Sequence, residues 1–196
     1  MSKEKKKSPS KGEVGYIDYN KKIRLILIIC TVVIIAAIFI TGLIINNTRN
    51  NICTVIAILL VLPLGKQLAT YLVMVKHKST DRQFADKVKS FNFEYDRLFD
   101  GIVTSKQKVM KVDAFVVGPD FVCAYSPDKK IDKKHFEEFL VEFIKNGKCK
   151  VTVSLIQDEK VFLNRLKQFE NKNEELDDYA KETISMVVAS VKSACI

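Results

Sequence analysis

Two acids and a lysine near the middle of the chain are the residues whose types and spacing could do chemistry. The stretch KVDAFVVGPDFVCAYSPDKK, residues 111–130, carries Asp113 near its start, and near its end Asp128 is followed two places later by Lys130. Carboxylates can hold a divalent cation, and a metal-bound water can hydrolyse a substrate. Metal-dependent hydrolysis by Asp113, Asp128 and Lys130 is therefore one hypothesis, and it requires elements that bring these side chains together.

Other common catalytic and metal sites have little material in this sequence. The sequence has two histidines, His77 and His135. They are too few for a histidine-based zinc site and leave few candidates for the histidine of a Ser-His-Asp triad. The five cysteines form no C-x-x-C motif, and a cytoplasmic domain keeps its thiols reduced, so disulfides are not expected. From these residues we expect no bound metal and no cofactor.

Asp113 belongs to a region whose patterns predict a small α+β domain. Two apolar strands, 112–117 and 121–126, fold back at Gly118-Pro119-Asp120. Helices are predicted from apolar residues recurring at three and four, and a strand from the alternation in 150–156. The predicted order is helix, strand, strand, strand, helix, strand, helix, helix. The first helix is at 81–89, the three strands are at 95–104, 112–117 and 121–126, and a helix at 136–144 precedes a strand at 150–156. A helix capped by Asp158 and a last helix at 176–191 complete the domain.

This order resembles the core of the restriction-endonuclease-like fold, and the hairpin is similar to that of its membrane-associated, nuclease-related branch. In that family an acid on the second strand and an acid-x-Lys on the third bind the metal and activate water. The resemblance implies that Asp113 is the first acid. It places the second acid at Ala124 and the lysine at Ser126, and these two side chains supply neither a carboxylate nor an amine. Asp128 and Lys130 lie beyond Pro127, which should end the strand and turn them away from Asp113. The resemblance therefore implies a nuclease fold that has lost its motif. It would be active only if Asp128 and Lys130 took the places of the missing acid and lysine beside Asp113.

Two apolar runs ahead of this domain predict a transmembrane hairpin. Residues 25–45 carry no charge, residues 52–75 follow after a polar link, and about 20 helical residues cross the hydrocarbon core of a bilayer. The first run is longer than the apolar part of a signal peptide and does not end in small residues. We therefore predict a basic disordered tail at 1–22, a transmembrane hairpin at 23–78 and a cytoplasmic domain at 79–196.

Positive charges predict the orientation of the hairpin. Eight lysines and arginines lie between Lys3 and Arg24, five lie between Lys76 and Lys89, and the link between the runs has only Arg49. Such asymmetry predicts that the hairpin crosses the plasma membrane with both termini in the cytoplasm and the link outside the cell. Attraction to anionic lipid also accounts for the net charge of +9, so the lipid bilayer is the expected partner and nucleic acid is not.

The second apolar run is interrupted by Pro63, Gly65 and Lys66. Proline removes a backbone hydrogen bond, so a kink is expected there. Neither run contains an acid that could pair with Lys66. Its side chain either extends to the headgroups or contacts a protein partner.

The whole chain is also similar to a family of uncharacterised bacterial two-span membrane proteins. The shared features are the basic tail, the Leu-Pro break in the second run, the sheet domain and an arginine-containing helix, here FLNRL at 162–166. This resemblance implies an architecture and no biochemical activity. The sequence favours a membrane-anchored domain that binds or regulates without catalysis. A membrane-tethered metal-dependent nuclease and an accessory subunit of a larger membrane complex are the alternatives, and the oligomeric state is left open.

Overall fold

The computed structural model describes residues 8–46, 52–105, 108–146, 150–172 and 176–196. The chain divides into two compact units, one formed by Met1–Tyr16 with Ser79–Ile196 and the other by Ile17–Lys78. The link that contains Arg49 lies outside the described residues, so the charge on which the orientation partly depends is not described.

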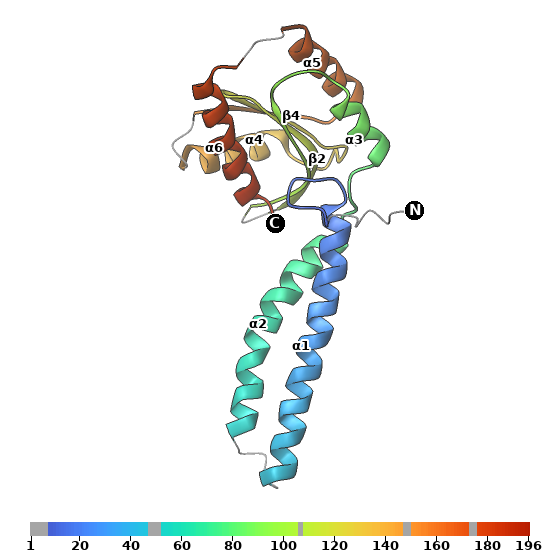
Figure 1. The fold of residues 1–196 in the computed structure, drawn as a ribbon, viewed down its shortest axis with the longest axis vertical. Coiled ribbons are helices and arrows are strands. Elements are labelled where there is room, and N and C mark those ends of the chain that lie inside the picture. Colours follow the sequence, from blue (N-terminus) through green and yellow to red (C-terminus); the bar gives the residue numbers. More distant parts are fainter. Residues whose placement is uncertain (1–7, 47–51, 106–107, 147–149, 173–175) are drawn as a thin grey trace, which may run out of the picture. The chain divides into compact units, whose positions relative to one another are not determined.

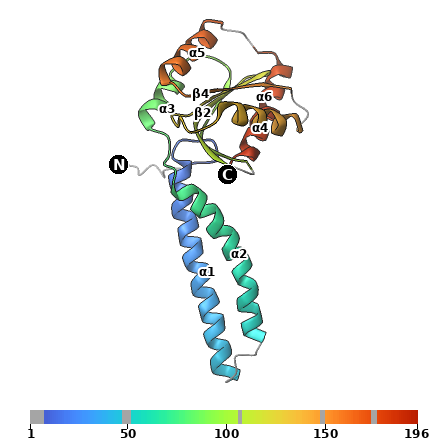
Figure 2. The ribbon, with the colours of Figure 1, turned by 180° about the vertical axis from the view of Figure 1, so that it is seen from behind.

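The second unit consists of two long apolar helices, α1 (Tyr16–Asn46) and α2 (Ile52–Val75). Figures 1 and 2 show them running in opposite directions. Both are long and apolar enough to cross a membrane, and almost none of the residues in their most apolar stretches is buried. The bounds of α2 agree with the predicted second span, whereas α1 begins nine residues before the predicted first span because residues 16–24 continue the same helix.

The other unit is built on a mixed sheet of four strands in the order β1-β2-β3-β4. β1 (Asp96–Thr104), β2 (Val109–Val117) and β3 (Phe121–Tyr125) are antiparallel neighbours, and β4 (Thr152–Ile156) runs parallel to β3. A parallel neighbour needs a crossover connection, which α4 (Lys133–Asn146) supplies between β3 and β4. The predicted order of helices and strands is confirmed.

Helices lie on both sides of this sheet (Figures 1 and 2). On one side, α3 (Arg82–Lys89) and α5 (Glu159–Lys172) meet the sheet through aromatic rings: Phe84 and Phe162 both contact Tyr125 of β3. On the other side, α4 contacts α6 (Asp178–Ala194). Asp158 caps α5 as predicted, since its Oδ1 accepts hydrogen bonds from the backbone N–H groups of Lys160 at 2.8 Å and Val161 at 3.1 Å.

Residues 8–15 correct the expectation of a disordered tail. The carbonyl of Gly12 accepts a hydrogen bond of 2.8 Å from the backbone N–H of Phe99, and Lys11 Nζ donates to the carbonyl of Cys195 at 2.7 Å. β1 is an edge strand, and its outer backbone groups need a partner wherever they are buried. Tail composition alone could not reveal this, because the partner lies almost ninety residues away.

Gly101 of β1 lets the sheet pack closely and provides a test of this packing. A Cβ at this position would lie 3.2 Å from Cys195 Sγ and would overlap the ring of Phe115, which is 1% exposed. We predict that Gly101→Ala lowers the free energy of unfolding by about 1–3 kcal/mol, because the buried ring has no space to move into. Urea unfolding of the full chain in detergent, followed by tyrosine fluorescence, measures the change.

Gly65→Ala is the matched control for that substitution. Nothing lies within 4 Å of a Cβ built on Gly65, which is in the middle of α2. Alanine is favoured over glycine inside a helix, so this variant should unfold at the same or higher urea concentration than wild type. An equal loss in both variants would contradict the packing described at Gly101.

Candidate functional site

Asp113 is buried on β2 and forms an ion pair with a lysine of its own strand. Its Oδ1 lies 2.5 Å from Lys111 Nζ, and the two side chains are 12% and 18% exposed. Residues two apart in a strand project from the same face, which explains how they meet. The ammonium group of Lys111 therefore occupies one oxygen of the carboxylate, where a metal-dependent enzyme would hold its cation.

β3, one of the two strands beside Asp113, offers no further carboxylate. The pairing Phe115 with Ala124 and Ala114 with Tyr125, continued by one residue, brings Ser126 opposite Asp113. Ala124 and Ser126, the positions at which the resemblance expects an acid and a lysine, are both fully buried. Ser126 is held in place, since its Oγ donates to the carbonyl of Lys111 at 2.6 Å and its backbone N–H donates to the carbonyl of Ile156 at 3.1 Å.

Asp128 and Lys130 are not brought to Asp113. Asp128 Oδ1 accepts a hydrogen bond of 2.9 Å from the backbone N–H of Lys130, so the acid closes its own turn after β3. The carbonyl of Asp128 accepts from Gln157 Nε2 at 3.1 Å. Across the described ranges, no ion pair or hydrogen bond joins either residue to Asp113, and no three His, Cys, Asp or Glu side chains are grouped as metal ligands.

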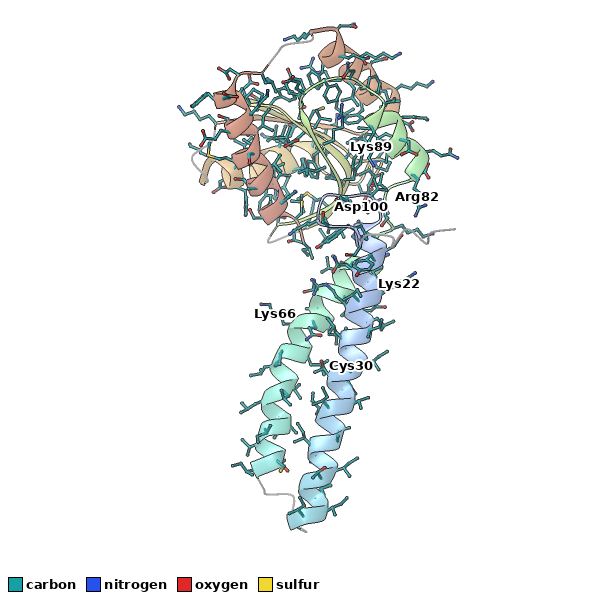
Figure 3. The ribbon with its side chains drawn as sticks, viewed as in Figure 1. Lys22, Cys30, Lys66, Arg82, Lys89 and Asp100 are labelled. Atoms are coloured by element: carbon teal, nitrogen blue, oxygen red, sulfur yellow. The ribbon has the colours of Figure 1, made fainter. Side chains whose placement is uncertain are left out.

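The interruption in the second span lies within a continuous helix. α2 runs through Pro63 and Gly65 without a break, and Lys66 is exposed. Figure 3 shows the side chain of Lys66 pointing away from α1. Both interpretations of Lys66, extension to the headgroups and contact with another protein, require the amine to face outward in this way.

Asp100 is a buried acid that the sequence analysis missed (Figure 3). It is 2% exposed, and its two oxygens accept hydrogen bonds from the backbone N–H groups of Thr80 at 2.6 Å and Gly15 at 2.8 Å. Gly15 immediately precedes α1, and Thr80 follows α2. One carboxylate thus binds both segments through which the chain passes between its two units.

The backbone of Asp100 explains how it reaches these segments. Its φ of 55° is in the left-handed region, which Asp tolerates better than most residues. The β1–β2 pairing places Asp100 opposite Asp113, and the positive φ turns it out of the regular ladder. Thr80 connects the two positions, because its Oγ1 also donates to the carbonyl of Asp113 at 2.9 Å. The available signal was the Asp-Gly pair between the apolar residues Leu98-Phe99 and Ile102-Val103 of the strand.

A serine–histidine contact is present but does not form a triad. His135 Nε2 lies 3.1 Å from Ser105 Oγ, and the same hydroxyl accepts from the backbone N–H of Lys108 at 3.1 Å. Among the described residues, no carboxylate contacts the imidazole of His135. The serine hydroxyl is bound to the backbone of Lys108, and within the described part of the chain no acid orients the ring as a general base.

The thiols of Cys123, which is buried, and Cys195, which is half-buried, are poor nucleophiles. Burial raises the pKa of Cys123 to about 11, although a hydrogen bond with Ser154 opposes the shift. Burial also raises the pKa of Cys195 to about 12. At neutral pH both groups are protonated, whereas cysteine chemistry requires the thiolate.

Comparisons with models of protein families, with curated proteins and with solved structures find no match to this chain. The two resemblances described from the sequence therefore remain predictions, and the site must be interpreted from its own geometry.

Removing the carboxylate of Asp100 should destabilise the domain. In Asp100→Ala two buried N–H groups lose their acceptor and alanine must adopt a positive φ, so we predict a loss of at least about 2 kcal/mol in the free energy of unfolding. Asp100→Asn keeps one acceptor oxygen and tolerates this φ, so its loss should be smaller. Urea unfolding of the full chain in detergent gives both values.

Asp120→Ala is the matched control, because Asp120 is an exposed acid in the turn between β2 and β3. It should unfold close to wild type. If Asp100→Ala did the same, the carboxylate would not hold the two segments.

Proposed function

We propose that this chain is an integral protein of the plasma membrane, with both termini in the cytoplasm, whose domain at residues 79–196 binds a ligand or partner without catalysis. The two apolar helices support the membrane location, and the lysines and arginines around them support the orientation. An accessory role in a larger membrane complex is compatible with this proposal, since Lys66 is exposed on α2.

The ion pair between Lys111 and Asp113 carries the non-catalytic part of the proposal. A hydrolytic metal site needs carboxylates that are free to coordinate and a water that can be polarised. Here the acid on β2 is paired within its own strand, and Asp128 is used by its own turn. The positions opposite Phe115 and Asp113 are Ala124 of β3 and Ser126, which directly follows β3. In the part of the chain that the structure describes, no set of three metal-ligand side chains supports the nuclease alternative, and the domain has a buried apolar core on which binding surfaces can be built.

We therefore predict no hydrolysis of DNA or RNA by the purified full chain in detergent, with either magnesium or manganese present. The measurement is the release of labelled fragments over time, with an unrelated membrane protein purified in the same way as the background control.

Asp113→Ala separates a real activity from contamination. Cleavage that is abolished in this variant and retained in Asp120→Ala would contradict the proposal and support the nuclease. Cleavage that is equal in wild type and Asp113→Ala would not come from the Asp113 site, and the background control shows whether it belongs to the chain at all.

A further inference from the structure

A groove between α3 and α5 gathers lysines from two distant parts of the sequence. Figures 1 and 2 show these two helices as neighbours on one side of the sheet. The groove has a volume of about 380 Å³, and we call it the lysine groove; its lining residues are Lys87, Ser90, Phe91, Lys160, Leu163, Asn164 and Lys167.

The spacing along α5 explains why its residues line one wall. Phe162, Leu166 and Phe169 are buried and fix the face of α5 that packs on the sheet. Residues 160, 163, 164 and 167 are three and four apart, so they form a neighbouring stripe on the same helix. This stripe faces the last turn of α3 and the residues that follow it, which bring Lys87, Ser90 and Phe91 to the opposite wall.

The positive charge of the lysine groove is only partly compensated. Lys87 Nζ lies 3.2 Å from Glu159 Oε1, and this exposed ion pair is screened by solvent. No ion pair involves the ammonium groups of Lys160 or Lys167 within the described ranges. The nearby acid Glu170 is engaged elsewhere, since its Oε1 accepts a hydrogen bond of 2.8 Å from the backbone N–H of Asn92.

The donors in the lysine groove match phosphate. Three ammonium groups and the side-chain amide of Asn164 can donate to phosphate oxygens, whereas the Ser90 hydroxyl already donates to the carbonyl of Lys87 at 2.8 Å. Charge-assisted hydrogen bonds of this kind are stronger than neutral ones. Phe91 and Leu163 add apolar surface beside these donors. The volume lies within the range of about 300–1,000 Å³ that is usual for small-molecule sites.

We propose that the lysine groove binds a small phosphate-bearing ligand. This rests on the proposed binding function of the domain and supplies its ligand class. A groove with two uncompensated ammonium groups selects an anion of more than one charge, and the apolar residues beside them accommodate the organic part of the ligand.

The test uses the full chain in nanodiscs of phosphatidylcholine and inorganic pyrophosphate as the probe, with affinity measured by isothermal titration calorimetry. The variant Lys160→Gln/Lys167→Gln should bind at least about tenfold more weakly than wild type, because two charge-assisted contacts are lost. The control Lys129→Gln/Lys134→Gln removes the same charge from exposed positions outside the groove and should bind like wild type. Urea unfolding of each variant verifies that it is folded.

Two further measurements, competition with lipid vesicles and binding of poly-glutamate, identify the source of the phosphate and test whether the groove prefers phosphate to carboxylate. If vesicles containing phosphatidylglycerol displace pyrophosphate from wild type, the proposal is supported with a lipid headgroup as the source. If they do not, it is supported with a soluble ligand. Equal affinity of wild type and Lys160→Gln/Lys167→Gln, or a preference for poly-glutamate over pyrophosphate, would overturn it.

Failure of this test is distinguishable from failure of the proposed function. No residue of the lysine groove belongs to the Asp113 site, so loss of the phosphate proposal leaves the hydrolysis result unchanged. Hydrolysis that depends on Asp113 would in turn leave the measured affinity of the groove unchanged.

Discussion

Apolar side chains on the outside of α1 and α2 impose the constraint on which the rest of the molecule depends. Ile44, Ile52 and Leu62 are 72%, 74% and 73% exposed, and such exposure continues along both helices. Transferring one side chain of this size from water to an apolar environment lowers the free energy by about 1.5–3 kcal/mol. Two helices that expose many such side chains are therefore unfavourable in water. In the membrane location that we propose, a bilayer covers this surface, and the lysines that flank the helices lie where anionic headgroups attract them. The location that we propose for the domain follows from this constraint.

Within the domain, two buried acids of the sheet, Asp100 and Asp113, lie where segments next to the helical hairpin are bound. Asp100 accepts hydrogen bonds from Gly15 and Thr80, on either side of the helical hairpin in the sequence. Asp113 lies opposite Asp100 on β2, and its carboxylate is paired with Lys111. Its backbone carbonyl accepts a hydrogen bond from the hydroxyl of Thr80. The centre of the sheet therefore anchors the connecting segments, and within the described ranges no three His, Cys, Asp or Glu side chains are grouped as metal ligands. The lysine groove, which we propose as a binding surface, lies away from Asp113 between α3 and α5.

Local patterns were enough to predict the elements of the fold, and long-range contacts were not. Alternation and three–four periodicity placed every strand and helix of the domain within a few residues, and Asp158 capped α5 as predicted. Docking of Gly12 on β1, the bonds of Asp100 and the contact of Ser105 with His135 join residues far apart in the sequence. No periodicity reports such contacts, because they depend on which sheet edge is free and which backbone groups lack partners. The lysine groove was missed for the same reason, since Lys87 and Lys160 meet only after α3 and α5 pack on the sheet.

Membrane insertion with both termini in the cytoplasm is the central claim of this account, and cysteine labelling in intact cells tests it most directly. In a chain whose native cysteines are replaced, one new cysteine is placed at Asn47, in the link between the helices, or at Ser79, at the start of the domain. An impermeant thiol reagent should label the Asn47→Cys chain in sealed cells and the Ser79→Cys chain only after lysis. Labelling of Ser79→Cys in sealed cells would contradict the orientation, and recovery of the unlabelled chain in the soluble fraction would contradict insertion itself.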